Sequence, residues 1–479
     1  MPPQNGPAIP ILAACLGFTA CAVGPRYTTP AAPSARSFVN APPVAARVVS
    51  QPPPALMTWW RGFGDAEMAS LIDRALAQNL DLAQAEARVV QARAQARAAG
   101  AALLPAGQFT GQGEYESQSL DSPTARVQEA FPGFQRYQKL YDLDVGASWE
   151  PDLFGGLRRG AEAARAQYQA SEAARAGSRL SVAAETADAY VRIRALQARL
   201  AVAEDEALTQ GQMASLTRLL ADRGVASREQ RNQAEAAAAG AEAAVPALKA
   251  GLESELIGIE VLVGVAPGSL HAELADGGAI PRAPGVEAAD GPVSLLRRRP
   301  DIIAAERNLA AANARIGAAT ADYYPKVTLS GVLGYEASDI GQLVGPAAFQ
   351  PQGVVGVRWR LFDFGRVDAE VAAARGARAE ALAAYRQSVL RATADVESAL
   401  SALVQDEAQA RALDSGETSL ANARASAEAA FAAGRASRLD VLAADAQWLS
   451  VRDQVVQARE AAARAAVATF RALGGGWSG

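Results

Sequence analysis

Residues 81–105 read DLAQAEARVVQARAQARAAGAALLP, and residues 301–325 read DIIAAERNLAAANARIGAATADYYP. Both stretches begin with Asp, carry Glu at offset 5 and close on Pro at offset 24. The likeness continues downstream, because Trp149 is matched by Trp359 and Gly224 by Gly434. A duplication of this length predicts two structural units of one kind that pack on each other.

Charge and composition bound the possible functions. The chain has 479 residues, with 46 basic and 51 acidic side chains and a formal net charge of −5. This near balance provides no basic field for nucleic acid, so no nucleic-acid partner is expected. Half of the residues are hydrophobic but only 6% are aromatic, and alanine dominates. Alanine-rich stretches favour helices that must pack closely or in number, since each residue buries little area.

Cysteine and histidine are rare. Cys15 and Cys21 lie near the N-terminus, and His271 is the single histidine. A disulfide network and a Cys/His metal site are therefore excluded for the body of the chain, and we expect no metal and no cofactor. His271 stands beside a Pro-Gly pair, so we expect a solvent-exposed loop histidine.

The first residues resemble an export signal. A short apolar run at residues 8–20 ends in small residues before Cys21, which predicts a signal peptide over residues 1–20. Cys15 and Cys21 compete as the lipidated residue of a bacterial lipoprotein. Residues 21–55 are rich in proline and predict an extended tether. A lipid followed by this tether would hold the body at a membrane surface.

Two long helical hairpins follow from stretches without proline or turn signals. The first hairpin is predicted at about 156–263 and the second at about 366–473. The outgoing helix of each would be about 100 Å long at 1.5 Å per residue. Each hairpin turns at a glycine that suits a helix C-cap, followed by a serine that can begin the returning helix. The first turn comprises Gly224, Val225, Ala226 and Ser227, and the second comprises Gly434, Arg435, Ala436 and Ser437.

Between the helices, four segments alternate apolar and polar side chains. They lie at about 107–117, 140–150, 326–337 and 353–362. The period of two predicts strands with one apolar and one polar face. Their length suits a transmembrane strand, and apolar-out with polar-in is typical of a membrane barrel with a wet lumen. A soluble sheet packed on the helices remains the alternative.

Four strands cannot close a barrel, and open sheet edges cannot face lipid. If the strands cross a membrane, several chains must pool them, and three copies would give twelve strands. The predicted fold is therefore mainly α with a small β part. Long coiled-coil hairpins would form a trimeric α-barrel, and four transmembrane strands per chain would form a 12-stranded trimeric β-barrel.

Two motifs carry a resemblance to a known family. The first is WWRGFGD at residues 59–65, and the second is LLRRRPDI at residues 295–302. They resemble TolC-like outer-membrane factors (outer membrane efflux proteins), with the OprM/NodT-like lipoprotein branch as the closer match. Residues 21–27, CAVGPRY, resemble the lipidated start of that branch. This resemblance favours Cys21 over Cys15 as the lipidated residue. We expect the arginines at 297–299 to pair with acids at the start of the next helix.

The resemblance implies a duct and its partners. The first family repeat would span residues 56–280 and the second residues 281–479. A homotrimer in the outer membrane, with a long periplasmic helical extension, would meet a periplasmic adaptor protein and an inner-membrane transporter of the resistance–nodulation–division (RND) type. Small molecules would pass through it passively to the exterior.

Family members close near the second helix tip, which implies a periplasmic gate there. Asp440 matches the first gate acid of the family, and Asp445 is the next acid along the helix. Leu439 and Leu442 offer a competing hydrophobic constriction. The turns at residues 224–227 and 434–437 would dock the adaptor.

Other functions stay open to different degrees. The tube of a type I protein exporter would share these sequence features, and a periplasmic coiled-coil scaffold lipoprotein would need no pore. An enzyme is not expected, because the sequence holds no G-x-S-x-G, Walker, HExxH or CxxC motif and the single histidine gives no base–nucleophile pair.

Overall fold

The computed structural model describes residues 22–31, 37–47, 52–287 and 291–477. Cys15, Cys21 and the predicted signal peptide lie outside these residues. The chain divides into two compact units. The described part of unit 1 comprises residues 22–30, Val90–Gln169 and Arg307–Ala383, and unit 2 comprises the rest. The chain is mainly helical with one small antiparallel sheet, as the sequence predicted.

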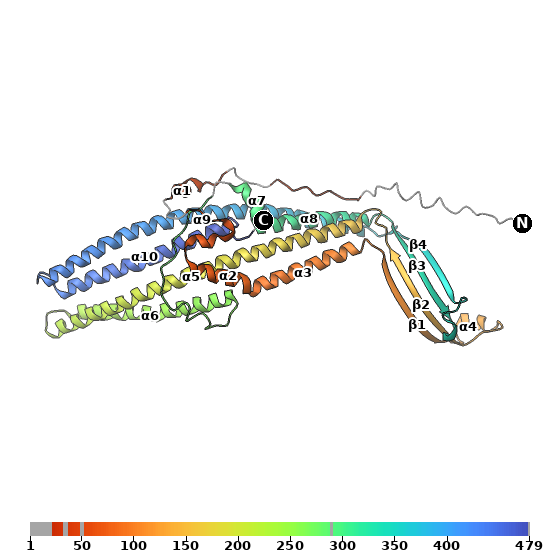
Figure 1. The fold of residues 1–479 in the computed structure, drawn as a ribbon, viewed down its shortest axis with the longest axis horizontal. Coiled ribbons are helices and arrows are strands. Elements are labelled where there is room, and N and C mark those ends of the chain that lie inside the picture. Colours follow the sequence, from red (N-terminus) through yellow and green to blue (C-terminus); the bar gives the residue numbers. More distant parts are fainter. Residues whose placement is uncertain (1–21, 32–36, 48–51, 288–290, 478–479) are drawn as a thin grey trace. The chain divides into compact units, whose positions relative to one another are not determined.

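The α-helices are α1 Ala41–Ala45, α2 Ala66–Gln78, α3 Leu80–Ala101, α4 Pro123–Gln128, α5 Gly156–Asp222, α6 Arg228–Val263, α7 Leu295–Arg298, α8 Pro300–Ala321, α9 Arg366–Ala432 and α10 Arg438–Ala472 (Figure 1). Short 3₁₀ helices lie at η2 Leu56–Phe63, η3 Pro292–Ser294 and η4 Ile340–Gln342. The strands are β1 Ala106–Ser117, β2 Tyr137–Trp149, β3 Lys326–Ala337 and β4 Phe349–Arg358. Within the described residues, no helix is both long enough and apolar enough to cross a membrane.

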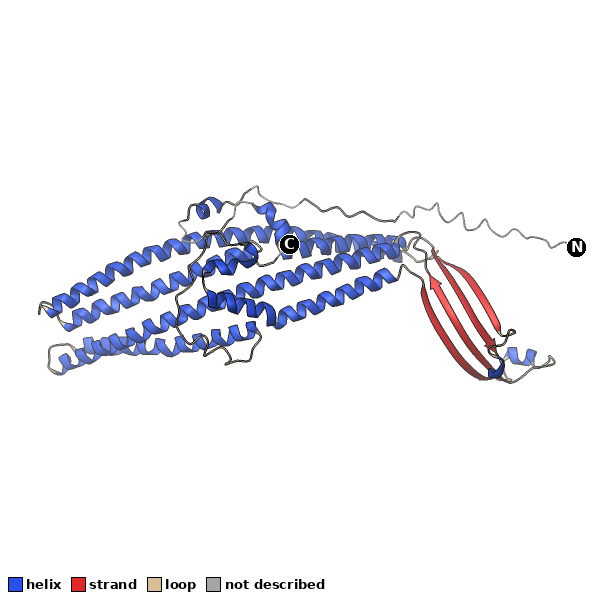
Figure 2. Cartoon of the chain, in the orientation of Figure 1, coloured by secondary structure: helices blue, strands red, loops and turns tan. Residues whose placement is uncertain are grey.

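The sheet in unit 1 runs in the order β1-β2-β3-β4 with antiparallel neighbours (Figure 2). Its two hairpins share one register. Ala106 pairs with Ser148 in the first hairpin, and Lys326 pairs with Arg358 in the second. Lys326 lies 220 residues after Ala106, and Arg358 lies 210 residues after Ser148. The same two offsets relate the duplicated stretches of the sequence. The duplicated halves therefore form matching β-hairpins.

Strand β4 lies four residues earlier than the sequence pattern predicted. The alternation continues through residues 359–362, but β3 begins at Lys326, whose partner Arg358 is the last paired residue of β4. Trp359 instead anchors the end of the hairpin, since its indole N–H donates to the carbonyl oxygen of Tyr323 at 3.0 Å. Trp149 donates in the same way to Leu103 at 3.0 Å. Each tryptophan thus ties the end of the second strand of its hairpin to the chain just before the first strand, which explains the matched positions of the two residues.

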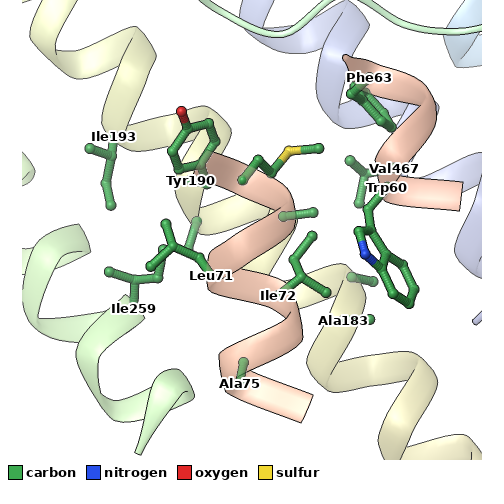
Figure 3. Close-up of a cluster of buried hydrophobic side chains, with 14 of the residues drawn as sticks. Trp60, Phe63, Leu71, Ile72, Ala75, Ala183, Tyr190, Ile193, Ile259 and Val467 are labelled. Carbon is green, nitrogen blue, oxygen red and sulfur yellow. The ribbon is translucent and has the colours of Figure 1, made fainter. Parts of the chain in front are cut away.

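The largest apolar core lies in unit 2 and draws on η2, α2, α5, α6 and α10. Helix α2 places Leu71 and Ile72 between α5 and α6, where both are fully buried (Figure 3). Trp59 stacks on Phe470 of α10 with ring centroids 5.4 Å apart. The WWRGFGD motif is therefore a core element, and its Asp65 begins α2 by accepting from the Met68 N–H at 2.9 Å.

Ion pairs link neighbouring helices of unit 2. Arg218 of α5 contacts Glu235 of α6 at 2.8 Å, and Arg459 of α10 contacts Asp414 of α9 at 2.8 Å. A further pair links the two hairpins, because Arg464 of α10 lies 2.7 Å from Asp188 of α5. Such pairs stabilise weakly one by one, so alanine-rich packing carries most of the association.

Described parts of the proline-rich segment, which was predicted as an extended tether, make hydrogen bonds to distant parts of the chain. In unit 1, Val23 N–H donates to the Phe154 carbonyl oxygen at 3.0 Å, and Asn313 donates to the Pro25 carbonyl oxygen at 3.0 Å. In unit 2, Asn40 donates to Glu397 of α9 at 2.8 Å. Proline composition predicts an extended backbone, but it carries no signal for hydrogen bonds made to distant helices.

Arg299, which lies just before α8, pairs with an acid at the start of that helix, as expected. Its guanidinium lies 2.7 Å from Asp301 and 3.0 Å from Asp395 of α9. Burial works against its charge, but these two carboxylates raise the pKa of Arg299.

Candidate gate and docking sites

The first hairpin tip closes with a left-handed glycine. Gly224 has φ of 71°, which favours glycine because it lacks Cβ. The N–H of Val225 donates to the Leu220 carbonyl oxygen at 2.8 Å, completing a C-terminal cap of α5. Ser227 then begins α6: its hydroxyl accepts from Gln230 N–H at 3.1 Å, and its N–H donates to the Gln230 side chain at 2.8 Å.

The second tip repeats this geometry. Gly434 has φ of 67°, and Arg435 N–H donates to the Ala430 carbonyl oxygen at 2.9 Å. Ser437 begins α10: its hydroxyl accepts from Asp440 N–H at 3.2 Å, and its N–H donates to Asp440 Oδ2 at 2.7 Å. Both turns are largely solvent-exposed, and Val225 is 74% exposed at the first tip. The tips therefore present matched, exposed surfaces.

Asp440 is the N3 residue of a capping box. Besides the Ser437 N–H, it accepts the Ser437 hydroxyl at 2.8 Å, and these donors lower its pKa. Gln230 fills the same position in the first repeat, so the sequence difference between Gln230 and Asp440 preserves one capping device. The Asp440 side chain therefore both caps α10 and carries the predicted gate charge. The serine three residues before an acid was a readable signal for the cap.

Asp445 has a partner on the neighbouring helix. It accepts from Arg424 Nε of α9 at 2.6 Å, and its side chain is 16% exposed. The Arg424 guanidinium also lies 4.7 Å from the Trp448 ring centroid. Asp445 therefore fastens α10 to α9. Asp440, in contrast, is exposed, so the structure does not bring the two acids into one environment.

The two candidate gate leucines also separate. Leu442 is 2% exposed and lines a groove with Leu208 and Leu216 of α5. Leu439 is half-buried. Leu442 thus packs α10 against α5 within one chain.

Sequence reasoning missed a buried polar cluster beneath the start of α2. The Tyr190 hydroxyl lies 3.0 Å from both Asp65 and Glu67, and Arg194 Nε donates to it at 3.1 Å. Arg194 also pairs with Glu67 and donates to the Asp276 carbonyl oxygen at 2.6 Å. Burial raises the pKa of Tyr190 far above its ordinary value. Only the spacing of Tyr190 and Arg194, one helical turn apart, hinted at this contact.

His271 lies in a loop, as its sequence context suggested, but it is half-buried and paired. Its ring nitrogens lie 3.1 Å from Glu253 and 3.1 Å from the fully buried Glu260. Glu253, then Glu260, raise the pKa of His271. Burial opposes ionisation of Glu260, but the N–H groups of Leu270 and Gly268 and the imidazole lower its pKa. The cluster fixes the loop after α6. Across the described ranges, no three His, Cys, Asp or Glu side chains are arranged to hold a metal ion.

Long helical hairpins with exposed tips, joined to strands that are apolar on one face, define a channel-type outer-membrane protein. A family model for outer membrane efflux proteins matches residues 71–265 and 291–475. The chain therefore belongs to the outer membrane efflux protein family, whose members are TolC-like channels of the outer membrane and not enzymes. The match confirms the resemblance carried by the two motifs.

Individual relatives agree with this family. The chain is 32% identical over 427 residues to the pyoverdine export outer membrane protein OpmQ of Pseudomonas putida, covering 88% of each chain. It is 30% identical over 468 residues to the toluene efflux pump outer membrane protein TtgC of Pseudomonas putida, covering 95% of this chain and 93% of the relative. The structure of the outer-membrane channel OprN is 32% identical, with a TM-score of 0.81 over 95% of this chain and 100% of that one.

Proposed function

We propose that three copies of the chain form the exit duct of a tripartite pump, with four strands from each copy closing a 12-stranded barrel. The observation that carries the proposal is the division of the sheet into two unlike faces. One face carries Phe109, Val145 and Leu333 in one row of the register, and each is more than half exposed. An apolar sheet face this exposed requires a non-aqueous neighbour, which lipid supplies.

The opposite face supports a wet lumen. Gln112, Asp142 and Glu336 stand side by side on β1, β2 and β3. Polar side chains inside and apolar side chains outside are the pattern of a transmembrane barrel. The edges β1 and β4 would meet neighbouring copies, since a sheet edge cannot be left open in lipid.

The helical hairpins supply the periplasmic part of the duct. Their exposed tips, residues 224–227 and 434–437, would dock a periplasmic adaptor, which joins the duct to an inner-membrane RND transporter. The transporter would supply the energy, and the duct would conduct small molecules passively. Relatives named for toluene efflux and pyoverdine export support this class of cargo.

The gate would lie at the second tip. Asp440 is exposed there, so three copies would bring three carboxylates to one level of the tube, and such a ring repels itself and favours cations. Leu439 would narrow the same level. Asp445 and Leu442 contribute by holding α10 to α9 and α5, so they would set the closed position instead of lining it.

The lipid anchor would be Cys21. Residues 22–30 belong to the same compact unit as the four strands, and Gly24 lies so close to Gly317 of α8 that a Cβ at Gly24 would be 2.4 Å from its Cα. This fixed segment would hold a lipid at residue 21 in the same membrane as the sheet.

Neighbouring residues of β4 allow a matched test. Val355 is 72% exposed on the apolar face, and Val354 is 46% exposed on the polar face. An arginine facing lipid at mid-depth costs about 2–4 kcal/mol, whereas a lumen arginine costs little. We expect Val355→Arg to abolish outer-membrane assembly and restore the drug accumulation of a deletion strain, and Val354→Arg to retain assembly and efflux. Equal behaviour of the two variants would contradict the duct.

A further inference from the structure

The turn of the first β-hairpin is longer than the turn of the second. Residues 118–136 join β1 to β2, whereas residues 338–348 join β3 to β4. The offset between the repeats falls from 220 residues before these turns to 210 after them, so the first turn has ten additional residues. It contains α4 and lies at the end of the strands away from α3 and α5 (Figure 1). The duplicated strands and helices do not account for these extra residues.

Hydrogen bonds hold the returning half of this turn against the strand ends. The Gln118 N–H donates to the Arg136 carbonyl oxygen at 2.9 Å and extends the pairing of β1 with β2 beyond their last paired residues. The Gln138 side-chain amide donates to the Gln135 carbonyl oxygen at 3.3 Å. Together these bonds fix the backbone of residues 135–136 beside β1 and β2.

The returning half of the turn and the strand ends enclose an open hollow of about 1000 Å³. Two cross-strand pairs form its floor, Glu114 opposite Leu140 and Glu116 opposite Gln138. Successive side chains of a strand alternate between the faces of the sheet, so these four share the polar face with Gln112. The hollow therefore opens on the polar face of the sheet.

Two aromatic side chains line the hollow from the turn. They are Phe131 and Phe134, on either side of Pro132 and Gly133. Phe134 is half-buried, whereas Phe131 is 66% exposed, so its ring still has surface for a ligand. The shorter turn of the second repeat, residues 338–348, contains no aromatic residue. The aromatic wall is thus specific to the longer turn.

The polar side of the hollow is negatively charged. Glu114 and Glu116 line it directly, and Asp142 follows on the same face two residues after the floor pair. Lys139 also borders the hollow, but it lies opposite Tyr115 and so belongs to the other face of the sheet. The hollow therefore combines carboxylates on its floor with aromatic rings on its wall.

We propose that this hollow binds an organic cation with an apolar or aromatic body, which places its charge at Glu114 and Glu116 and its body against Phe131 and Phe134. Aromatic faces attract cations, and aromatic cages bind quaternary ammonium groups in this way. The volume is that of a site for a small molecule. An inorganic cation would use the carboxylates and leave the aromatic wall without a role, and the carboxylates repel an anion.

The place of this site in transport rests on the proposed duct. In the duct, the polar face lines the lumen and the turn lies at the exit, so the hollow would hold a cation where cargo leaves the chain. The site would then favour cationic over anionic cargo at the last step of passage. Binding itself needs only residues of one chain, and it can be measured without conduction.

Isothermal titration calorimetry of the full chain, purified in a nonionic detergent, tests the site with three probes and a protein-free micelle blank. Benzyltriethylammonium has a ring and a positive charge, tetraethylammonium lacks the ring, and benzenesulfonate has a ring with a negative charge. We expect saturable binding of benzyltriethylammonium, about fivefold weaker binding of tetraethylammonium and no detectable binding of benzenesulfonate. Benzenesulfonate binding as tight as that of benzyltriethylammonium, or no saturable binding of either, would overturn the proposal.

Matched variants of the same turn locate the binding. Phe131→Ser should weaken benzyltriethylammonium binding about fivefold, and Glu114→Gln combined with Glu116→Gln should weaken it on the order of tenfold. Val127→Ser and Glu129→Gln change exposed residues of the turn that do not line the hollow, and both should bind within about twofold of wild type. If the lining variants bind as the controls do, the hollow is not the site.

The outcomes separate the site from the duct. If the wild-type protein runs as a heat-dissociable oligomer from outer-membrane fractions but does not bind benzyltriethylammonium, the site is wrong and the duct stands. If the probe binds and the variants behave as expected while no oligomer forms, the cation site stands and the duct fails.

Discussion

Replacing Ser437 by alanine removes the hydroxyl that begins α10 at the proposed gate. That hydroxyl accepts from Asp440 N–H at 3.2 Å and donates to Asp440 Oδ2 at 2.8 Å. Loss of a serine N-cap costs about 1 kcal/mol, which corresponds to about a fivefold increase in local opening. We expect hydrogen exchange of the first-turn amides of α10 to rise about fivefold. Ser227→Ala should do the same to α6, because the first tip has the same cap.

Asp440→Gln separates the cap from the charge. In the first repeat, a glutamine in this position accepts from the serine N–H at 2.8 Å, so glutamine at 440 should keep the capping box. We expect first-turn exchange within about twofold of wild type. If the Asp440 carboxylate also gates the duct, the same variant should reduce the cation selectivity of conductance in planar bilayers.

Two results would refute this reasoning. If Asp440→Gln frays the helix as strongly as Ser437→Ala does, the negative charge and not the hydrogen bond holds the turn. If Asp440→Gln preserves exchange and leaves conductance and selectivity unchanged, Asp440 is a cap alone and the gate lies elsewhere.

The packing of unit 2 yields three further predictions. The raised pKa of His271 means that its stabilising charge is fully present below about pH 6.5 and is lost as pH rises through the folded-state pKa. The protection of the loop amides after α6, taken relative to their intrinsic exchange rates at each pH, should therefore fall in a step as pH rises. His271→Asn should abolish that pH step, and its survival in the variant would contradict the assignment. Arg194→Met should destabilise the fold by about 3 kcal/mol, because Arg194 is itself buried and its loss leaves the buried Tyr190 hydroxyl and the Asp276 carbonyl oxygen without its hydrogen bonds. Arg61→Met at an exposed pair should change stability by no more than about 0.5 kcal/mol, and urea midpoints followed by helical circular dichroism measure both variants. Arg424→Met should release Asp445 and increase the open time of single channels, and an unchanged open time would exclude the Arg424–Asp445 pair from gating.

Local patterns predicted the elements well because those signals act between near neighbours. Glycine at 224 and 434 followed by serine at 227 and 437 placed both turns correctly, since each cap needs only four to six consecutive residues. The alternation found all four strands. It misplaced β4 because the end of a strand depends on where its partner begins, and Lys326 sets that limit from another part of the chain.

The candidate site was less predictable from the sequence. Asp440 and Asp445 look alike as acids on one helix. The first is engaged by a serine three residues away, and the second by Arg424, which lies 21 residues earlier on another helix. The contacts of His271 with Glu260 and Glu253 likewise depend on how the loop folds back on α6. Contacts of this kind leave no periodic trace.

By itself, the sequence determined that the chain is duplicated, which segments are helix and strand, and which family it resembles, because spacing, capping and periodicity are properties of the chain alone. Only the tertiary structure decided that both β-hairpins share one register, that proline-rich residues make hydrogen bonds to distant segments, and that Asp445 and His271 are paired. The physical reason is that burial and hydrogen-bond partners come from segments far apart in the chain.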